Sequence, residues 1–121
     1  MASPAKRIPR SFGYAFEGLL AILRTTPNFW LHIAAAALAL FVSIALRLSL
    51  AEIALVLLTI AVVLVVEAFN TALEALADVA SPDYHPLIKR AKDISAAAVL
   101  IAALAAVGVG GLLFIPRLIT R

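Results

Sequence analysis

The chain has 121 residues, of which 64% are hydrophobic and 14% are charged, and its formal net charge is +3. This composition is too apolar for a soluble domain and indicates one small, all-α integral membrane domain. The sequence contains no cysteine, which excludes disulfides and thiolate metal sites. Its basic residues flank the apolar runs, as membrane topology signals do, so no nucleic-acid partner is expected.

The N-terminal region combines a basic start with an amphipathic segment. Residues 1–10 carry two prolines and predict a flexible start on an anionic membrane face. Ser11 is a plausible N-cap for a helix over about residues 11–24. The apolar side chains of this helix recur at helical spacing, which favours a helix lying in the membrane plane; a cytoplasmic helix packed on the bundle fits the same pattern. These side chains are Phe12, Phe16, Leu19, Leu20 and Leu23.

Three apolar runs follow, and a helix of about 20 residues crosses the hydrocarbon of a bilayer. The predicted spans cover about residues 28–47, 53–78 and 93–116. The second run is long enough only with its acidic end, which places Glu67 near one interface or just inside it. His32, a lone histidine near the start of the first span, is interpreted as an interface residue and not as a metal ligand.

The basic residues also predict the topology. They cluster before Ser11, at Arg24 and in the polar loop 81–93, whereas the turn that begins at Arg47 carries a single arginine. By the positive-inside rule, the N-terminus and the loop 81–93 are cytoplasmic. Arg117 and Arg121 then fall on the outer side, against the rule.

The second span ends in a polar stripe. At about 100° per residue, Glu67, Asn70, Glu74 and Asp78 fall within about 80° of one another on one helix face. A carboxylate at membrane depth costs at least ~2.5 kcal/mol, so such residues normally mark a functional site. An alternative is that the stripe only forms hydrogen bonds to neighbouring helices and stabilises an assembly.

Lys92 and Asp93 begin the third span, and a short loop connects this span to the acidic stripe. We therefore expect the stripe and the Lys92–Asp93 pair to meet at one membrane depth. Carboxylate and amide oxygens are ligands that Mg²⁺ prefers, a lysine attracts phosphate oxygens, and a carboxylate can accept a proton from a lipid hydroxyl. The alternatives are a solvated charge pair for Lys92 and Asp93, a helix cap for Asp78, and plain loop residues for Tyr84 and His85.

Several motifs resemble those of the small bacterial diacylglycerol kinase family, which includes the undecaprenol kinases. The most specific is the Glu-x-x-Asn-x-x-x-Glu pattern that begins at Glu67, together with the downstream Lys-Asp pair. The likeness extends through nearly the whole chain. The other matching segments are Ser81–Pro86, whose form is closer to the undecaprenol kinases, and also Ser11–Ala15, Asn28–Phe29 and Ala91–Asp93.

The resemblance implies a homotrimer of three-span subunits, each with an N-terminal surface helix, in the bacterial inner membrane with the N-terminus in the cytoplasm. It also implies transfer of the γ-phosphoryl group of ATP, with Mg²⁺, to a membrane lipid alcohol, either undecaprenol or diacylglycerol. Glu67 would be the catalytic base, Asn70 and Asp93 would complete the catalytic group, and Glu74 would bind the metal. The expected nucleotide contacts are Arg7, Tyr14, Asp83, Tyr84, His85, Lys92 and Asp93. The expected lipid contacts are Ser11, Tyr14, Phe16 and Glu67.

Two residues depart from the family pattern. Thr26 stands where the family commonly has a second metal-binding glutamate, and Trp30 stands where an arginine often follows the Asn-Phe pair. A threonine hydroxyl is a weaker metal ligand than a carboxylate, which leaves a non-enzymatic membrane protein, either a pseudokinase or an assembly factor, as the alternative function. A small multidrug-type transporter fits less well, because the first apolar run contains no carboxylate.

Overall fold

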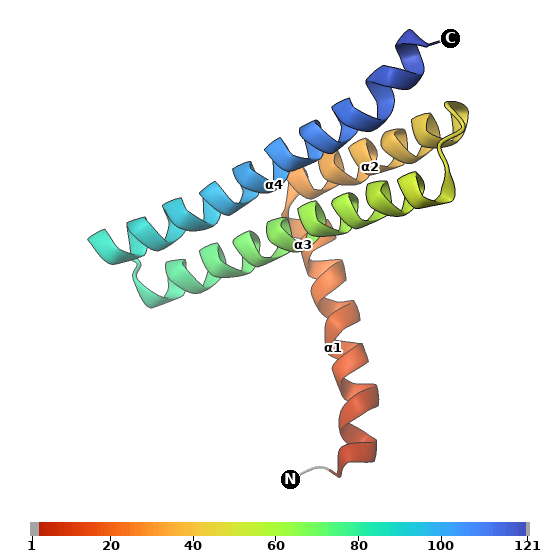
Figure 1. Cartoon of the computed structure of the whole chain (residues 1–121). Helices are drawn as coiled ribbons and strands as arrows, with labels where there is room; N and C mark the ends of the chain where they lie inside the picture. Colours follow the sequence, from red (N-terminus) through yellow and green to blue (C-terminus); the bar gives the residue numbers. More distant parts are fainter. Residues whose placement is uncertain (1–2, 121) are drawn as a thin grey trace.

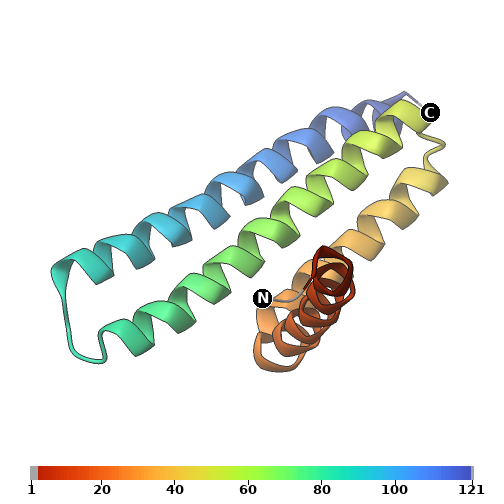
Figure 2. The same cartoon turned by 90° about the horizontal axis from the view of Figure 1, so that it is seen from below.

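The computed structural model describes residues 3–120 and forms four α-helices with no strand in that range. They are α1 (Pro4–Thr25), α2 (Pro27–Ala45), α3 (Leu50–Ala80) and α4 (Pro86–Ile119). Helices α2, α3 and α4 run along one another as a bundle, in which α3 contacts both neighbours, while α1 leaves the bundle crosswise (Figures 1 and 2). The three bundle helices are long and apolar enough to cross a membrane. The all-α prediction with three candidate spans is therefore confirmed.

The N-terminal helix begins earlier than the sequence suggested. The prediction of a flexible start is wrong for the described part of that segment, because the helix already begins at Pro4. A proline is well suited to the first turn of a helix, where no N–H is needed. Ser11 is also not a cap: it lies inside α1, and its Oγ donates to the carbonyl of Arg7 at 2.9 Å.

The polar loop between α3 and α4 is shorter than expected. Only residues 81–85 lie outside the helices, and α4 starts at Pro86, seven residues before the predicted span. The His85 side chain caps this start, since its Nδ1 accepts a hydrogen bond from the backbone N–H of Leu87 at 3.2 Å. Lys92 and Asp93 consequently lie within α4 and not at its first residue.

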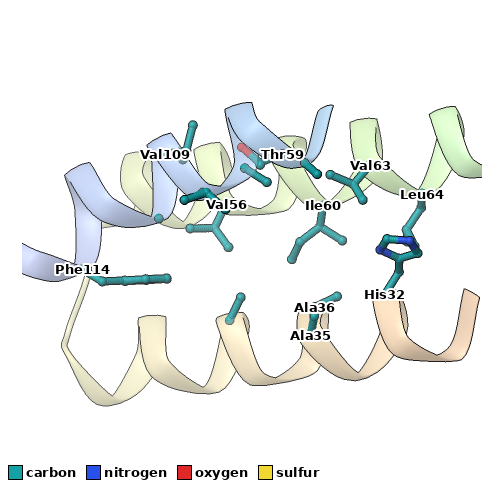
Figure 3. A pocket seen from close by; sticks show the side chains of 15 residues that line it. His32, Ala35, Ala36, Val56, Thr59, Ile60, Val63, Leu64, Val109 and Phe114 are labelled. Carbon is teal, nitrogen blue, oxygen red and sulfur yellow. The ribbon is translucent and has the colours of Figure 1, made fainter. Parts of the chain in front are cut away.

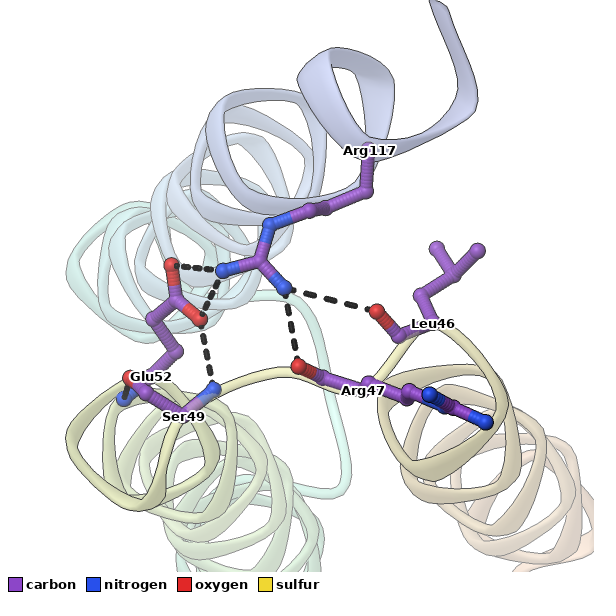
Figure 4. A network of polar contacts seen from close by, with 5 residues as sticks. All are labelled: Leu46, Arg47, Ser49, Glu52 and Arg117. Atoms are coloured by element: carbon purple, nitrogen blue, oxygen red, sulfur yellow. Dashed lines mark hydrogen bonds and ion pairs between the residues drawn. The ribbon is translucent and has the colours of Figure 1, made fainter. Parts of the chain in front are cut away.

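The opposite end of the bundle is closed by Arg117, near the end of α4 (Figure 4). Its guanidinium donates to both carboxylate oxygens of Glu52, at 3.0 and 2.7 Å, and to the carbonyls of Leu46 and Arg47, at 3.3 and 2.9 Å. Glu52 also accepts from the backbone N–H of Ser49 in a capping box at the start of α3. We call this group of residues the Arg117 clasp. The clasp therefore gives a charged partner to Arg117, which the positive-inside rule places on the outer side. Arg121 lies outside the described residues.

The bundle helices differ in length, and the difference lies at one end. At about 1.5 Å per residue, the 19 residues of α2 span about 28 Å, close to the hydrocarbon thickness. The 31 residues of α3 and the 34 of α4 span about 46 and 51 Å. Because the α2–α3 turn is short and α4 ends beside it, the excess length projects beyond the start of α2 (Figure 1). This projection carries the acidic stripe.

Candidate functional site

A polar cleft lies where the chain turns from α1 into α2 and faces α3. Pro27 begins α2, so Thr26 remains extended between the two helices, and its carbonyl accepts from the N–H of Phe29 at 3.0 Å. The indole Nε1–H of Trp30 donates to the carbonyl of Leu23 at 2.7 Å and ties α2 to the last turns of α1. The cleft is lined by Thr25, Thr26, Pro27, Asn28, Glu67, Asn70, Thr71 and Glu74.

Glu67 is the buried carboxylate of this cleft. Only 7% of the residue is exposed, and its Oε2 lies 3.6 Å from Nε2 of His32 on α2. His32 lies one turn after Phe29, so Glu67 is level with the start of α2 and hence with the edge of the predicted hydrocarbon layer. The sequence interpretation of His32 as an interface residue missed its contact with the acid, because no spacing rule links a residue of α2 to one of α3.

Asn70 is oriented by the neighbouring helix. Its Oδ1 accepts a hydrogen bond of 2.7 Å from the Oγ of Ser95 on α4. This is the kind of contact expected if the polar stripe joins helices, and it also fixes the direction of the amide group beside Glu67. Ser95 lies on the small-residue face of α4, and no motif in the sequence pointed to its side chain as a partner.

The charged residues beyond the cleft form two separate ion pairs. Lys92 Nζ lies 2.6 Å from Oδ1 of Asp78 on α3, whereas Asp93 pairs with Lys89 on its own helix, also at 2.6 Å. Asp78 was considered as a helix cap, but its side chain pairs across to α4. Both pairs are largely exposed, so each contributes little to stability and can exchange partners readily. The structure thus brings Lys92 to the acidic stripe and directs Asp93 elsewhere.

The turn between α3 and α4 holds three more of the predicted nucleotide contacts. Asp83, Tyr84 and His85 are all exposed there, beyond the Lys92–Asp78 pair. The Ser81 hydroxyl donates to the carbonyl of Asp83 at 2.7 Å and holds the turn in shape. These side chains lie at the end of the projection and do not line the cleft.

The predicted contacts on α1 are not brought to the cleft within one chain. Arg7, Ser11, Tyr14 and Phe16 are exposed on the part of α1 that runs away from the bundle (Figures 1 and 2). Ile22, near the end of α1, is the buried residue of this helix. The single chain therefore presents these four side chains to solvent or lipid, or to another molecule.

A second cavity, of about 300 Å³, lies between α2, α3 and α4 at membrane depth (Figure 3). Alanines of α2 and α4 and branched side chains of α3 form most of its wall. His32 borders it at the end nearest Glu67 (Figure 3). The labelled lining residues are His32, Ala35, Ala36, Val56, Thr59, Ile60, Val63, Leu64, Val109 and Phe114.

The fold and the site are those of a small helical membrane protein, with a buried carboxylate at the edge of its bundle and a lysine and further acids projecting beyond it. The family described as prokaryotic diacylglycerol kinase matches residues 13–114. The chain belongs to this family of membrane lipid kinases, which confirms the resemblance seen in the sequence.

Three relatives illustrate the range of the family. A diacylglycerol kinase of Synechocystis sp. is 40% identical over 111 residues, covering 91% of this chain and 63% of the relative, so the chain spans less than two thirds of that protein. An undecaprenol kinase of Bacillus subtilis is 37% identical over 112 residues, covering 93% of this chain and 91% of the relative. A diacylglycerol kinase of Escherichia coli K12 is 36% identical over 101 residues, covering 84% and 83%.

Proposed function

We propose that the protein transfers the γ-phosphoryl group of ATP to the hydroxyl of a membrane lipid alcohol, undecaprenol or diacylglycerol. The reaction takes place at the cytoplasmic face of the bacterial inner membrane, where the N-terminus also lies. The observation that carries the proposal is the burial of Glu67 level with the start of α2. The relatives named diacylglycerol kinase and undecaprenol kinase support both acceptors.

The different helix lengths account for how one site serves a lipid and a nucleotide. A lipid alcohol keeps its hydroxyl at the membrane interface, which is the depth of Glu67. Glu74, Asp78 and Lys92 lie one or more turns further along the projection, where a water-soluble nucleotide has access. The acceptor hydroxyl and the γ-phosphate can therefore meet in the polar cleft while the lipid stays in the membrane and the nucleotide stays in water.

In the proposed reaction, Glu67 accepts the proton of the lipid hydroxyl. The lipid oxygen forms a bond to the γ-phosphorus, the bond from that phosphorus to the β,γ-bridging oxygen breaks, and ADP leaves. Asn70, held by Ser95, orients the reacting group beside the base. Lys92 exchanges its contact with Asp78 for phosphate oxygens, which stabilises the charge that develops during transfer. Asp93 contributes from the flank of α4.

The donors in the cleft fit a magnesium ion that is bound together with phosphate. Within residues 3–120, no three His, Asp or Glu side chains lie close enough to form a metal site by themselves. Mg²⁺ typically takes one or two carboxylates and completes its shell with substrate phosphates and water. Glu74 and Thr26, which line the same cleft, would hold such an ion. When bound, it would neutralise charge on the transferred phosphoryl group.

The remaining nucleotide and lipid contacts require more than one chain. Asp83, Tyr84 and His85 extend the site beyond the cleft, whereas Arg7, Ser11, Tyr14 and Phe16 point away from their own bundle. A homotrimer would bring the α1 helix of one subunit to the cleft of its neighbour. In such an assembly the α1 residues contact the nucleotide and the lipid, as expected from the family.

The proposal is tested with purified protein in mixed micelles, with MgATP and either undecaprenol or diacylglycerol. The wild type should release ADP and form the phosphorylated lipid, and comparison of the two acceptors identifies the better one. Glu67→Gln removes the base with almost no change in shape and should lower kcat at least about 100-fold. Glu17→Gln, the same change on the exposed surface of α1, is the matched control and should leave kcat unchanged. A wild type that is inactive with both alcohols would support the non-enzymatic alternative.

A further inference from the structure

Glu67 and His32 are in contact at the boundary between the two cavities. Glu67 lines the polar cleft and His32 lines the apolar cavity, and the two side chains meet with Nε2 and Oε2 3.6 Å apart. Both groups are shielded, with side-chain exposures of 28% for the histidine and 9% for the acid. The distance is just beyond hydrogen-bond range, so a small movement of either side chain brings Nε2 to the carboxylate oxygen as a donor. Within residues 3–120, His32 is the one Lys, Arg or His side chain whose nitrogen lies within 4.0 Å of the Glu67 carboxylate.

The other nearby charges are already paired with different residues. Lys92 contacts Asp78, and Lys89 contacts Asp93, so neither lysine compensates the buried acid. A carboxylate removed from water requires a partner, and the partner that is present also fixes its orientation. The shortest contact with Nε2 is made by Oε2, and Glu67 also lines the polar cleft.

Helix packing does not account for a histidine at this position. The neighbouring positions of α2 that face α3 across the apolar cavity are Ala35, Ala36 and Ala39. A further small or aliphatic residue would continue that surface at lower desolvation cost. The feature that distinguishes position 32 is its proximity to Glu67.

We propose that His32 is the positioning residue for Glu67: its Nε2 holds one carboxylate oxygen, so that the other is directed at the lipid hydroxyl. This inference rests on the proposed function, because it assigns a partner to the proposed base. His32 itself does not touch the reacting atoms. Its effect is on the fraction of the time that Glu67 spends in the productive orientation, and therefore on kcat more than on the KM for the lipid alcohol.

Two amide substitutions at this position separate positioning from packing. His32→Gln retains a nitrogen donor close to where Nε2 lies, whereas in His32→Asn the donor is one carbon shorter and cannot reach Oε2. His32→Asn should lower kcat on the order of tenfold with an unchanged lipid KM, which is the low end of the loss seen when an orienting partner is removed. His32→Gln should retain most of the wild-type kcat. Thr59→Val removes another polar group from the same apolar cavity and should behave as wild type.

Each rate is divided by the amount of folded protein, which gel filtration measures. If His32→Asn does not fold, His32→Ala takes its place. Equal kcat for wild type, Gln and Asn would overturn the assignment, and so would equal impairment of the two amide variants. An inactive wild type with both lipid alcohols would instead defeat the proposed function, so the two failures are distinguishable. In a Glu67→Gln background, changing His32 should have no further effect, because the two residues act as a unit.

Discussion

Thr26 and Glu74 approach the polar cleft from two sides, one from the break before α2 and the other from α3. The hydroxyl of Thr26 provides a neutral donor where a carboxylate would strengthen the binding of a hard divalent cation. In the proposed reaction, nucleotide phosphates and water would therefore have to complete more of the metal shell than they would beside two carboxylates.

Thr26→Glu should lower the Mg²⁺ concentration required for half-maximal activity, on the order of tenfold, since even an indirect change of partner alters metal affinity by that amount. The measurement is a magnesium titration of lipid phosphorylation at fixed ATP. Thr120→Glu places the same charge at the opposite end of the bundle, on an exposed residue whose hydroxyl bonds to the carbonyl of Pro116, and serves as the control for a general charge effect. Equal responses of the two variants would contradict a specific role for position 26.

The residues of the site were predictable to different degrees. The helical spacing of Glu67, Asn70 and Glu74 predicts their common face, and the structure places all three around one cleft. The partners His32 and Ser95 were not predictable, because they come from other helices, and their identity depends on how the helices rotate against one another. Spacing within one helix carries no information on that rotation.

At the scale of the helices, the Arg117 clasp joins the end of α4 to the turn between α2 and α3 (Figure 4). Arg117 and Glu52 keep side-chain exposures of 35% and 27%, so the pair is partly shielded, and one guanidinium nitrogen, Nη2, donates to both carboxylate oxygens. The clasp lies at the far end of the bundle from Glu67. It contributes to the stability of the bundle and does not contact the proposed catalytic residues.

Arg117→Met should therefore lower the midpoint of unfolding, because it removes the hydrogen bonds to Glu52 and to the carbonyls of Leu46 and Arg47, while kcat of the folded fraction stays unchanged. The measurement is thermal or denaturant unfolding in detergent. Arg47→Met is the matched control, because the Arg47 side chain is exposed and points away from Glu52 (Figure 4). Equal destabilisation by the two changes, or a large loss of kcat in Arg117→Met, would argue against this role.

The starts of α1 and α4 differ from the sequence prediction. Pro4 lies in the predicted flexible start and Pro86 in the predicted polar loop, but each occupies the first turn of a helix, where proline is favoured. The ends of the apolar runs did not predict the helix boundaries, because a helix can continue beyond its apolar run. Helices α3 and α4 do so with polar and ion-paired side chains in place of apolar ones.

At the scale of the whole molecule, few residues of any span are buried inside the single chain. The crosswise direction of α1 also removes Arg7 and Tyr14 from the cleft of their own chain (Figure 1). Both features are expected of a subunit whose helices and site are completed by identical neighbours.

Mixed assemblies test this arrangement. Arg7→Met and Glu67→Gln should each be inactive alone, because each homotrimer lacks one element of every site. Co-assembly of the two should restore part of the activity, since some clefts then combine an intact Glu67 with an intact α1 from a neighbour. Separately purified variants that are mixed without dissociation are the control and should remain inactive. No recovery in verified mixed trimers would show that α1 serves its own chain.

Helix α2 begins level with Glu67, so the part of α3 beyond Glu67 has α4 as its long neighbour within the chain. In the proposed reaction, this side of α3 would give the polar cleft direct access to the surrounding leaflet. A long polyprenol or a diacyl lipid would then enter from the bilayer and leave by the same route after phosphorylation, with its tails in the hydrocarbon throughout.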